Sequence, residues 1–284
     1  MTNAVATARA VERVVDSQVA PVGSFTVRRA LPARDRHAVG PWVFLDHFGP
    51  FKSKPGVDGV GAHPHAGIET VTYLLEGRNE HRDSAGHHGI VGAGGAQWMT
   101  AGRGVIHSEH PLDTVQHGIQ LWTSLPRSLK QMAPSYQRIE ATAIPRVDRG
   151  GAGVRVIAGE FEGVRGPAQT LMPLFLWHAS LPSGATLETA VDVAFEAAAY
   201  VIAGEGRFGP EDAVAAAPGQ LVVWKEGDGG IHAGNPGTKP LELLVFGGAP
   251  AEGPLVFHGP FVMNTVEQIR AAEVAYRTGR MGTL

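Results

Sequence analysis

Two short motifs in the first half of the sequence place metal-binding side chains two residues apart. His63 and His65 form an H-x-H pair, and His107 and Glu109 form an H-x-E pair. Residues i and i+2 of a β-strand point to the same face of a sheet. If the two pairs lie on adjacent strands, three imidazoles and one carboxylate meet. This ligand set suits Fe(II), Mn(II), Ni(II), Cu(II) or Zn(II) better than Ca²⁺ or Mg²⁺.

The composition excludes several other kinds of site. The 284 residues include no cysteine, so disulfides, iron–sulfur clusters and thiolate ligands are absent. Lys and Arg number 24 against 27 Asp and Glu, which is not the basic excess of a nucleic-acid-binding protein. No apolar run approaches the ~18 residues of a membrane span, and the first residues lack a signal-peptide core. We therefore expect a cytoplasmic protein that binds neither nucleic acid nor membrane.

The elements that must hold these motifs are predicted to be short strands. Gly (38) and Pro (20) separate apolar runs such as WVFLDHF, ETVTYLLEG, QLVVWKEG and LELLVFGG, as turns separate strands. Helical periodicity is clear only near the C-terminus, where Thr265 and Gln268 form a capping box. The pattern predicts an all-β protein of the sandwich or barrel type with a short C-terminal helix.

An internal similarity indicates that one barrel is duplicated. Residues 68–77 resemble 195–204, and residues 95–107 resemble 219–232 in the same order. We place the boundary at the turn-rich stretch that begins at residue 145, which gives domains 1–145 and 146–284.

The second copy serves as an internal control for the metal ligands. The alignment sets His232 against His107, but it sets Ala190, Asp192 and Gly234 against His63, His65 and Glu109. Only one of the four candidate ligands is kept. We therefore expect the second barrel to bind no metal.

Long segments of the chain resemble the pirin family of the cupin superfamily. GAHPHAGIETVTYLLEG, HRDSAGHHGIVGAGGAQWMTAGRGVIHSE and HGIQLW resemble its N-terminal half, and HGPFVMNTVEQIRAAEVAYRTGRMG resembles its C-terminal end. The resemblance implies two tandem cupin (jelly-roll-like) barrels, of which the N-terminal one holds a mononuclear iron. It also implies one Fe(II) per chain, other divalent transition metals being possible, with ligands that match His63, His65, His107 and Glu109.

Glu69 is the rival for the carboxylate position. It follows His65 by four residues, where many other cupins place their carboxylate ligand. Its counterpart Glu196 is kept in the second copy although the neighbouring ligands are gone, which favours a structural role for both. We prefer Glu109, mainly on the resemblance to pirins.

Other residues are candidates for the surroundings of the metal. Gln120 and Trp122 share one strand face, and the resemblance places that face beside the metal cavity; ordinary core packing is the alternative. Phe48 is a further candidate at the same opening. His81 is expected to be a hydrogen-bonded strand histidine, although it could also point toward the site.

The ligand set and the resemblance lead to two hypotheses about function. The first is a quercetin (flavonol) 2,3-dioxygenase that uses Fe(II) and O₂, with Glu109 as ligand and proton acceptor and a flavonol-like molecule as substrate. The second is a non-enzymatic, iron-dependent regulatory protein that docks a protein partner, with Lys52, Lys54, Arg78 and Arg82 as a candidate basic patch. We expect a monomer in either case.

Overall fold

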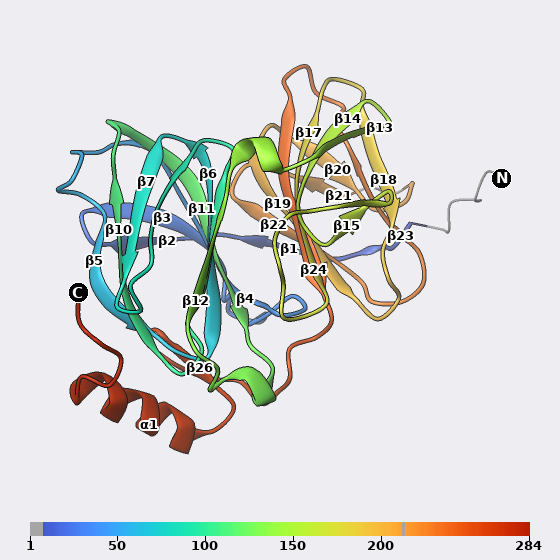
Figure 1. Cartoon of the computed structure of the whole chain (residues 1–284). Helices are drawn as coiled ribbons and strands as arrows, with labels where there is room; N and C mark the ends of the chain where they lie inside the picture. Colours follow the sequence, from blue (N-terminus) through green and yellow to red (C-terminus); the bar gives the residue numbers. More distant parts are fainter. Residues whose placement is uncertain (1–7, 212–213) are drawn as a thin grey trace. The chain divides into compact units, whose positions relative to one another are not determined.

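The computed structural model describes residues 8–211 and 214–284, which are mostly β-strand with one α-helix, α1 (Val266–Arg277) (Figure 1). The all-β prediction is confirmed. Within the described residues no helix is both long and apolar enough to cross a membrane. The chain forms two compact units. The N-barrel unit comprises Val19–Arg29, Trp42–Ala143 and Ala251–Leu284, and the C-barrel unit comprises residues 8–18, Ala30–Pro41 and Ile144–Pro250.

The N-barrel unit contains a seven-stranded and a four-stranded sheet. The larger sheet has the order β12 (Ser135–Ile139), β9 (Ala96–Thr100), β6 (Ile68–Glu76), β11 (Val115–Ser124), β4 (Trp42–Lys52), β3 (Phe25–Leu31), β2 (Gln18–Val22). The smaller has the order β5 (Val60–His65), β10 (Val105–Pro111), β7 (Arg78–Asp83), β8 (His88–Gly92). A hairpin of β25 (Val256–His258) and β26 (Phe261–Met263) and the short helices η1 (Arg127–Leu129) and η2 (Ala141–Ala143) complete the unit.

The C-barrel unit repeats this plan with a second seven-stranded and a second four-stranded sheet, as the duplication predicts. The larger sheet has the order β1 (Val11–Asp16), β22 (Gln220–Trp224), β19 (Glu196–Ala203), β24 (Leu241–Gly248), β17 (Leu174–Leu181), β14 (Ala152–Ala158), β13 (Arg146–Arg149). The smaller has the order β18 (Thr186–Ala190), β23 (Gly230–Gly234), β20 (Gly206–Phe208), β21 (Val214–Ala216), and β15 (Glu160–Phe161) pairs with β16 (Val164–Arg165).

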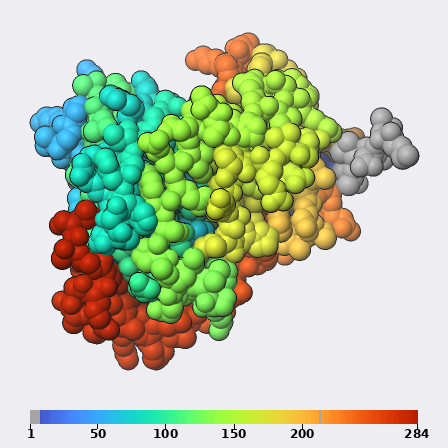
Figure 2. Space-filling model, viewed as in Figure 1, coloured from blue at the N-terminus to red at the C-terminus, as the bar shows by residue number. Residues whose placement is uncertain are grey.

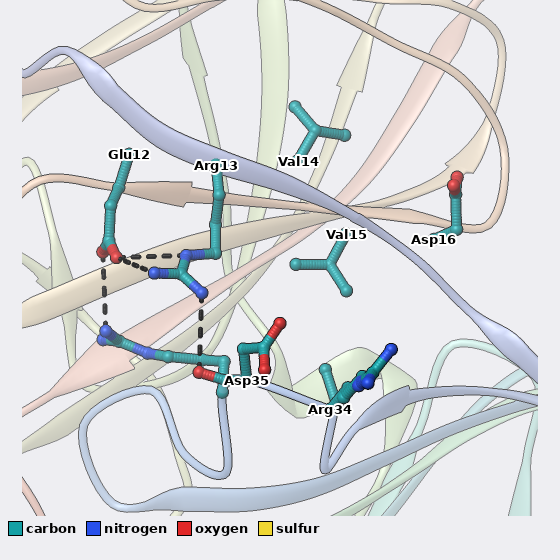
Figure 3. A pocket seen from close by; sticks show the side chains of 9 residues that line it. Glu12, Arg13, Val14, Val15, Asp16, Arg34 and Asp35 are labelled. Carbon is teal, nitrogen blue, oxygen red and sulfur yellow. Dashed lines mark hydrogen bonds and ion pairs between the residues drawn. The ribbon is translucent and has the colours of Figure 1, made fainter.

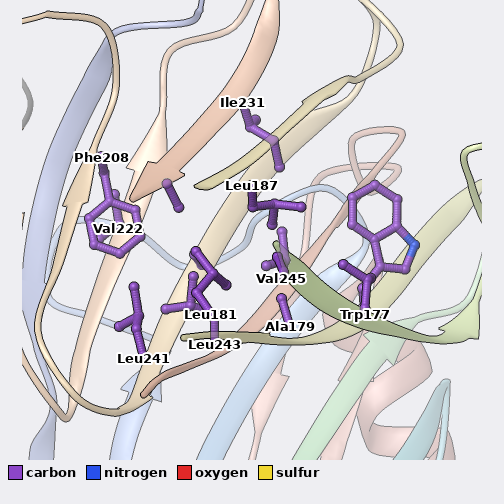
Figure 4. Packing of buried hydrophobic residues seen from close by; sticks show 14 of the residues in the cluster. Trp177, Ala179, Leu181, Leu187, Phe208, Val222, Ile231, Leu241, Leu243 and Val245 are labelled. Carbon is purple, nitrogen blue, oxygen red and sulfur yellow. The ribbon is translucent and has the colours of Figure 1, made fainter. Parts of the chain in front are cut away.

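The two sheets of the C-barrel unit enclose an apolar core. Both sheets contribute to it: Leu187, Phe208 and Ile231 come from the smaller sheet, and Val222 and Val245 come from the larger (Figure 4). Each of these five side chains is at most 1% exposed. Burial of such side chains is the main force that holds two sheets together.

The chain divides between Ala143 and Ile144, beside the expected boundary at residue 145, but its two end segments belong to the opposite units from those expected. Strand β1 pairs with β22, so the first described strand belongs to the C-barrel unit. The C-terminal segment belongs instead to the N-barrel unit, where Phe261 bridges to Ala66 and α1 buries Ile269 and Ala272. Figure 2 shows α1, in red, at the surface. The end segments differ from the expectation because an edge strand and an amphipathic helix pack against partners far away in sequence.

Candidate metal centre

The two motifs lie on paired strands, as their spacing predicts. Strands β5 and β10 are antiparallel, with His107 opposite His63 and Val105 opposite His65. The Nε2 atom of His63 lies 3.1 Å from Nε2 of His65 and 3.0 Å from Nε2 of His107. Within the described part of the chain, these three residues form the one group of His, Cys, Asp or Glu whose ligand atoms all lie within 4.8 Å of one another.

The hydrogen bonds of the other ring nitrogens show that this group fits a cation. The Nδ1 atom of His63 lies 2.7 Å from the carbonyl oxygen of Gly61, and Nδ1 of His65 lies 3.1 Å from that of Pro260. A carbonyl oxygen only accepts, so both Nδ1 atoms carry a proton and Nε2 is the atom of each ring that can bind a cation. The two Nε2 lone pairs then face each other, an arrangement that a divalent cation between them stabilises.

Burial keeps the two interior imidazoles neutral. It lowers the pKa of His65 to about 3, and the neighbouring His63 lowers it further. Burial likewise lowers the pKa of His107 well below its usual range, with smaller contributions from His65, His63 and His81. Only the neutral form of histidine can bind a metal. The site is therefore ready to bind a divalent ion at neutral pH.

Glu109 lies in the same interior but is held by other polar side chains. Its Oε1 atom accepts hydrogen bonds from Thr72 Oγ1 at 2.7 Å, from Asn79 Nδ2 at 3.3 Å and from Gln97 Nε2. It is not a member of the group formed by the three histidines. Its role as fourth ligand therefore stays a prediction.

Glu69 is fully buried and bound elsewhere. It accepts hydrogen bonds from Thr100 Oγ1 at 2.9 Å and Thr123 Oγ1 at 3.2 Å. Alternation along β6 puts it on the opposite face from Thr72, which contacts Glu109. Burial raises its pKa, and its hydrogen bonds oppose that rise. This placement supports the structural role that the sequence favoured.

Two of the three candidate substrate-binding residues contact the surroundings of the metal group. Gln120 Oε1 lies 2.7 Å from Thr72 Oγ1, and the ring of Trp122 meets that of His65 edge-on with centroids 4.9 Å apart. Phe48 lies opposite Gly118, on the same face of β4 as Phe44. Its place beside the substrate stays a prediction.

Several polar residues around the site were not singled out from the sequence. Thr72, Asn79 and Gln97 all bind the Glu109 carboxylate. His81 is a hydrogen-bonded strand histidine, as expected, with Nε2 3.2 Å from Asp83 Oδ2. A signal for these residues was present in β7, whose alternating N-x-H-x-D sequence turns Asn79, His81 and Asp83 to one buried face.

The structure corrects the proposed counterpart of His107 in the second copy. On β23, the residues that enter the apolar core are Ile231 and Ala233, so His232 between them points to the other face of the strand. A shift of one residue exchanges the two faces of a strand, and a sequence alignment does not detect it. The inward positions of this strand thus offer no ligand, and the absence of a metal from the second barrel stays a prediction.

A separate surface depression of about 500 Å³ lies on the C-barrel unit, between β1 and residues 33–36 (Figure 3). Three of its charged side chains pair with one another. Arg13 binds Glu12 at 2.7 Å, and Arg36 reaches the same carboxylate at 3.4 Å. Its lining contains none of the three clustered histidines.

The fold and the three-histidine group define a bicupin, a chain of two cupin barrels, with one candidate metal site. Comparison with family models gives pirin over residues 24–123 and the pirin C-terminal cupin domain over residues 176–282. The chain belongs to the pirin family, which confirms the resemblance seen in its sequence motifs.

Relatives and solved structures agree with this assignment. A pirin-like protein of Solanum lycopersicum is 37% identical over 257 residues, which cover 90% of this chain and 87% of the relative. A crystal structure described as quercetin 2,3-dioxygenase from Acinetobacter baumannii is 30% identical, with TM-score 0.89, and the match covers 98% of this chain and 99% of that one. The bacterial pirin YhhW of Escherichia coli, solved with nickel(II), shares the fold at 20% identity and TM-score 0.62, over 86% of this chain and 98% of that one.

Proposed function

We propose that the N-barrel unit binds one Fe(II) through His63, His65, His107 and Glu109 and acts as a quercetin (flavonol) 2,3-dioxygenase. The observation that carries the proposal is the convergence of three imidazole Nε2 atoms inside one cupin barrel. The similarity to the A. baumannii protein, which extends over nearly the whole chain, supports the choice of substrate.

The charge of this ligand set suits a flavonol. Three neutral imidazoles and one carboxylate leave a divalent ion with a formal charge of +1, which favours a singly charged chelating anion such as a deprotonated flavonol. A bound divalent ion would supply coordination positions for substrate and O₂ and would lower the pKa of the substrate hydroxyl group. In the proposed reaction O₂ is incorporated, the central ring opens and one carbon leaves as carbon monoxide.

The residues around Glu109 suit it to accept the proton of the substrate hydroxyl. Its described hydrogen bonds all go to Oε1, where Thr72, Asn79 and Gln97 hold the carboxylate. The other oxygen, Oε2, is therefore the atom that we assign to the metal or to the proton. General-base help of this kind contributes typically about 10²–10⁴-fold to a rate.

Aromatic side chains next to the histidines suit a flat substrate. Trp122 stacks on Phe44 with ring centroids 4.0 Å apart and 11° between the planes. The Arg29 guanidinium lies 4.7 Å from the centroid of the Phe44 ring and binds Asp46 through two hydrogen bonds. We assign this stack, with Gln120, as the wall against which the rings of the flavonol pack; Phe48 extends the same wall.

Replacement of Glu109 by Gln tests the proposal. Glu109→Gln keeps an oxygen donor but loses the basicity, so quercetin-dependent O₂ uptake at saturating Fe(II) should fall about 10²–10⁴-fold. Glu69→Gln is the matched control, because this buried carboxylate faces away from the site, and it should keep the rate. A Glu109→Gln variant that oxidises quercetin at the original rate would contradict the role of the base.

The alternative function is an iron-dependent binding protein. The relative from Solanum lycopersicum is named a pirin-like protein, a name that specifies no enzymatic activity. The basic patch expected for this function is partly neutralised, because Arg78 binds Asp113 at 2.8 Å and Arg82 binds Glu80 at 2.9 Å. Wild-type protein that is loaded with Fe(II) but consumes no O₂ with any flavonol would favour this alternative.

A further inference from the structure

The three clustered histidines are oriented in two different ways. His63 and His65 bind backbone carbonyl oxygens through Nδ1, as described above. The Nδ1 atom of His107 instead lies 3.4 Å from Nδ1 of His81, and Nε2 of His81 lies 3.2 Å from Oδ2 of Asp83. His81 and Asp83 are nearly as buried as His107 itself. Only His107 therefore depends on a chain of side chains for its orientation.

The carboxylate of Asp83 orients this chain of side chains at one end. A carboxylate only accepts, so Nε2 of His81 carries the proton that is donated to Asp83. In the relay, Nδ1 of His81 is the acceptor of the Nδ1 proton of His107. The Nε2 atom of His107 is left without a proton and faces His63. We propose that Asp83 and His81 form a relay that fixes His107 as the tautomer with a free Nε2 lone pair.

The relay is itself held in place from both ends. Asp83 Oδ1 accepts hydrogen bonds from the backbone N–H groups of Ala85 at 2.9 Å and His87 at 3.0 Å, which fix the carboxylate in the turn after β7. The ring of His81 stacks on Tyr136 with centroids 4.5 Å apart and 13° between the planes. Tyr136 in turn donates to Gln97 Oε1 at 3.3 Å. The imidazole of His81 thus has little freedom to turn.

The C-barrel unit lacks a relay where it lacks the metal group. In the N-barrel unit His81 on β7 lies opposite Glu109 on β10. In the C-barrel unit the matching strands β20 and β23 set Phe208 opposite Ala233, and both residues belong to the apolar core. A phenylalanine ring fills the space but accepts no proton. This difference is expected if His81 orients the metal ligand His107 and is not needed for the fold.

Two readouts that do not need turnover test the relay. Long-range ¹H–¹⁵N correlation spectra of the metal-free protein at neutral pH report which nitrogen of His107 carries the proton. Competition between the protein and a chelator for Ni(II) reports metal affinity. In wild-type protein we expect the Nδ1–H form of His107. In His81→Phe we expect a mixture of both tautomers and Ni(II) binding about 10–100-fold weaker, the usual effect of losing the partner of a ligand.

Matched variants separate the relay from general loss of structure. His81→Gln restores an acceptor oxygen and should recover most of the affinity. His88→Phe removes a histidine from the neighbouring strand β8, where its side chain is exposed and binds Glu80, and should leave both readouts unchanged. Unchanged Ni(II) affinity in His81→Phe, or a wild-type His107 with its proton on Nε2, would overturn the relay.

The relay rests on the metal site of the proposed function but not on the choice of flavonol as substrate. Absence of quercetin turnover would count against the proposed function. The tautomer of His107 and the affinity for Ni(II) would still test the relay. The wild-type tautomer also decides the question if His81→Phe fails to fold, because it needs neither a variant nor a metal.

Discussion

The two barrel units share the same plan of one seven-stranded and one four-stranded sheet, but the interior of one is lined by polar side chains at the positions where the other has apolar ones. On one strand of the smaller sheet, the N-barrel unit turns His107 and Glu109 inward, whereas the C-barrel unit turns Ile231 and Ala233 inward. On the strand beside it, His81 in the first unit matches Phe208 in the second. The difference shows that this topology does not depend on the metal. The fold requires that side chains fill the space between the two sheets, and both the polar and the apolar set of side chains do so.

A polar interior carries a requirement that an apolar one does not. A buried polar group that lacks a partner is costly, so each must be paired. Around Glu109 this pairing is provided by Thr72, Asn79 and Gln97. The inward residues of β23 in the C-barrel unit, Ile231 and Ala233, have no polar side-chain atoms and need no such partners. We therefore expect metal binding and core stability to respond to substitutions in different units.

The largest effect is expected when a clustered histidine is removed. His63→Ala takes away one of the three converging Nε2 atoms and should abolish stoichiometric metal binding. This loss is larger than the roughly 10–100-fold decrease in metal affinity that follows when a ligand loses its hydrogen-bond partner. Metal analysis after loading with Fe(II) or Ni(II) measures it. The circular-dichroism spectrum should not change, because the barrel has its own core.

His232→Ala is the control for this experiment. His232 faces away from the core of the C-barrel unit, so its loss should leave the metal content as in wild type. If His232→Ala lost metal as His63→Ala does, the two units would not differ in the way described.

The next effect concerns the stability of the apolar barrel. Phe208→Ala leaves a cavity in the C-barrel core, where the side chain is fully buried, and should lower the free energy of unfolding of that unit by about 3–5 kcal/mol. Urea unfolding followed by tryptophan fluorescence measures it. Affinity for Ni(II) should be unchanged below the transition, and a parallel loss of Ni(II) binding would contradict the division of roles.

A further effect, small near neutral pH, is a pH dependence of the stability of the N-barrel unit. Burial lowers the pKa of His47 to about 3, helped by the nearby His117 and Arg28, whereas the unfolded chain takes up this proton near pH 6.5. Stability is therefore complete above about pH 6.5 and falls as the pH drops toward 3, by up to about 1.4 kcal/mol per pH unit from this residue. Urea midpoints at several pH values should fall less steeply in His47→Gln, and equal slopes would contradict this origin.

Much of the site could be predicted because its signal is local. The spacing of His63–His65 and His107–Glu109 determines which side chains share a strand face, and the pairing of β5 with β10 brings the histidines together. The hydrogen bond from His65 Nδ1 to the carbonyl oxygen of Pro260 could not be predicted, because it depends on a C-terminal segment that returns to the N-barrel unit.

The less successful predictions share one physical cause. Strand faces alternate with every residue, so the alignment that matched His232 to His107 placed it on the wrong face of its strand. The end segments were assigned to the wrong units for a related reason, since the pairing of β1 with β22 is a contact between distant segments. Local patterns predict elements and faces, whereas partners across the chain depend on the whole fold.

The central claim is that one barrel holds a metal and the other does not. The most direct test is an anomalous difference map from crystals grown with Ni(II) or Fe(II). We predict one peak per chain, within about 2.0–2.2 Å of the Nε2 atoms of His63, His65 and His107, with Glu109 turned toward it. A peak at His232, a metal held by Glu69 in place of Glu109, or no peak at the three histidines would contradict the account.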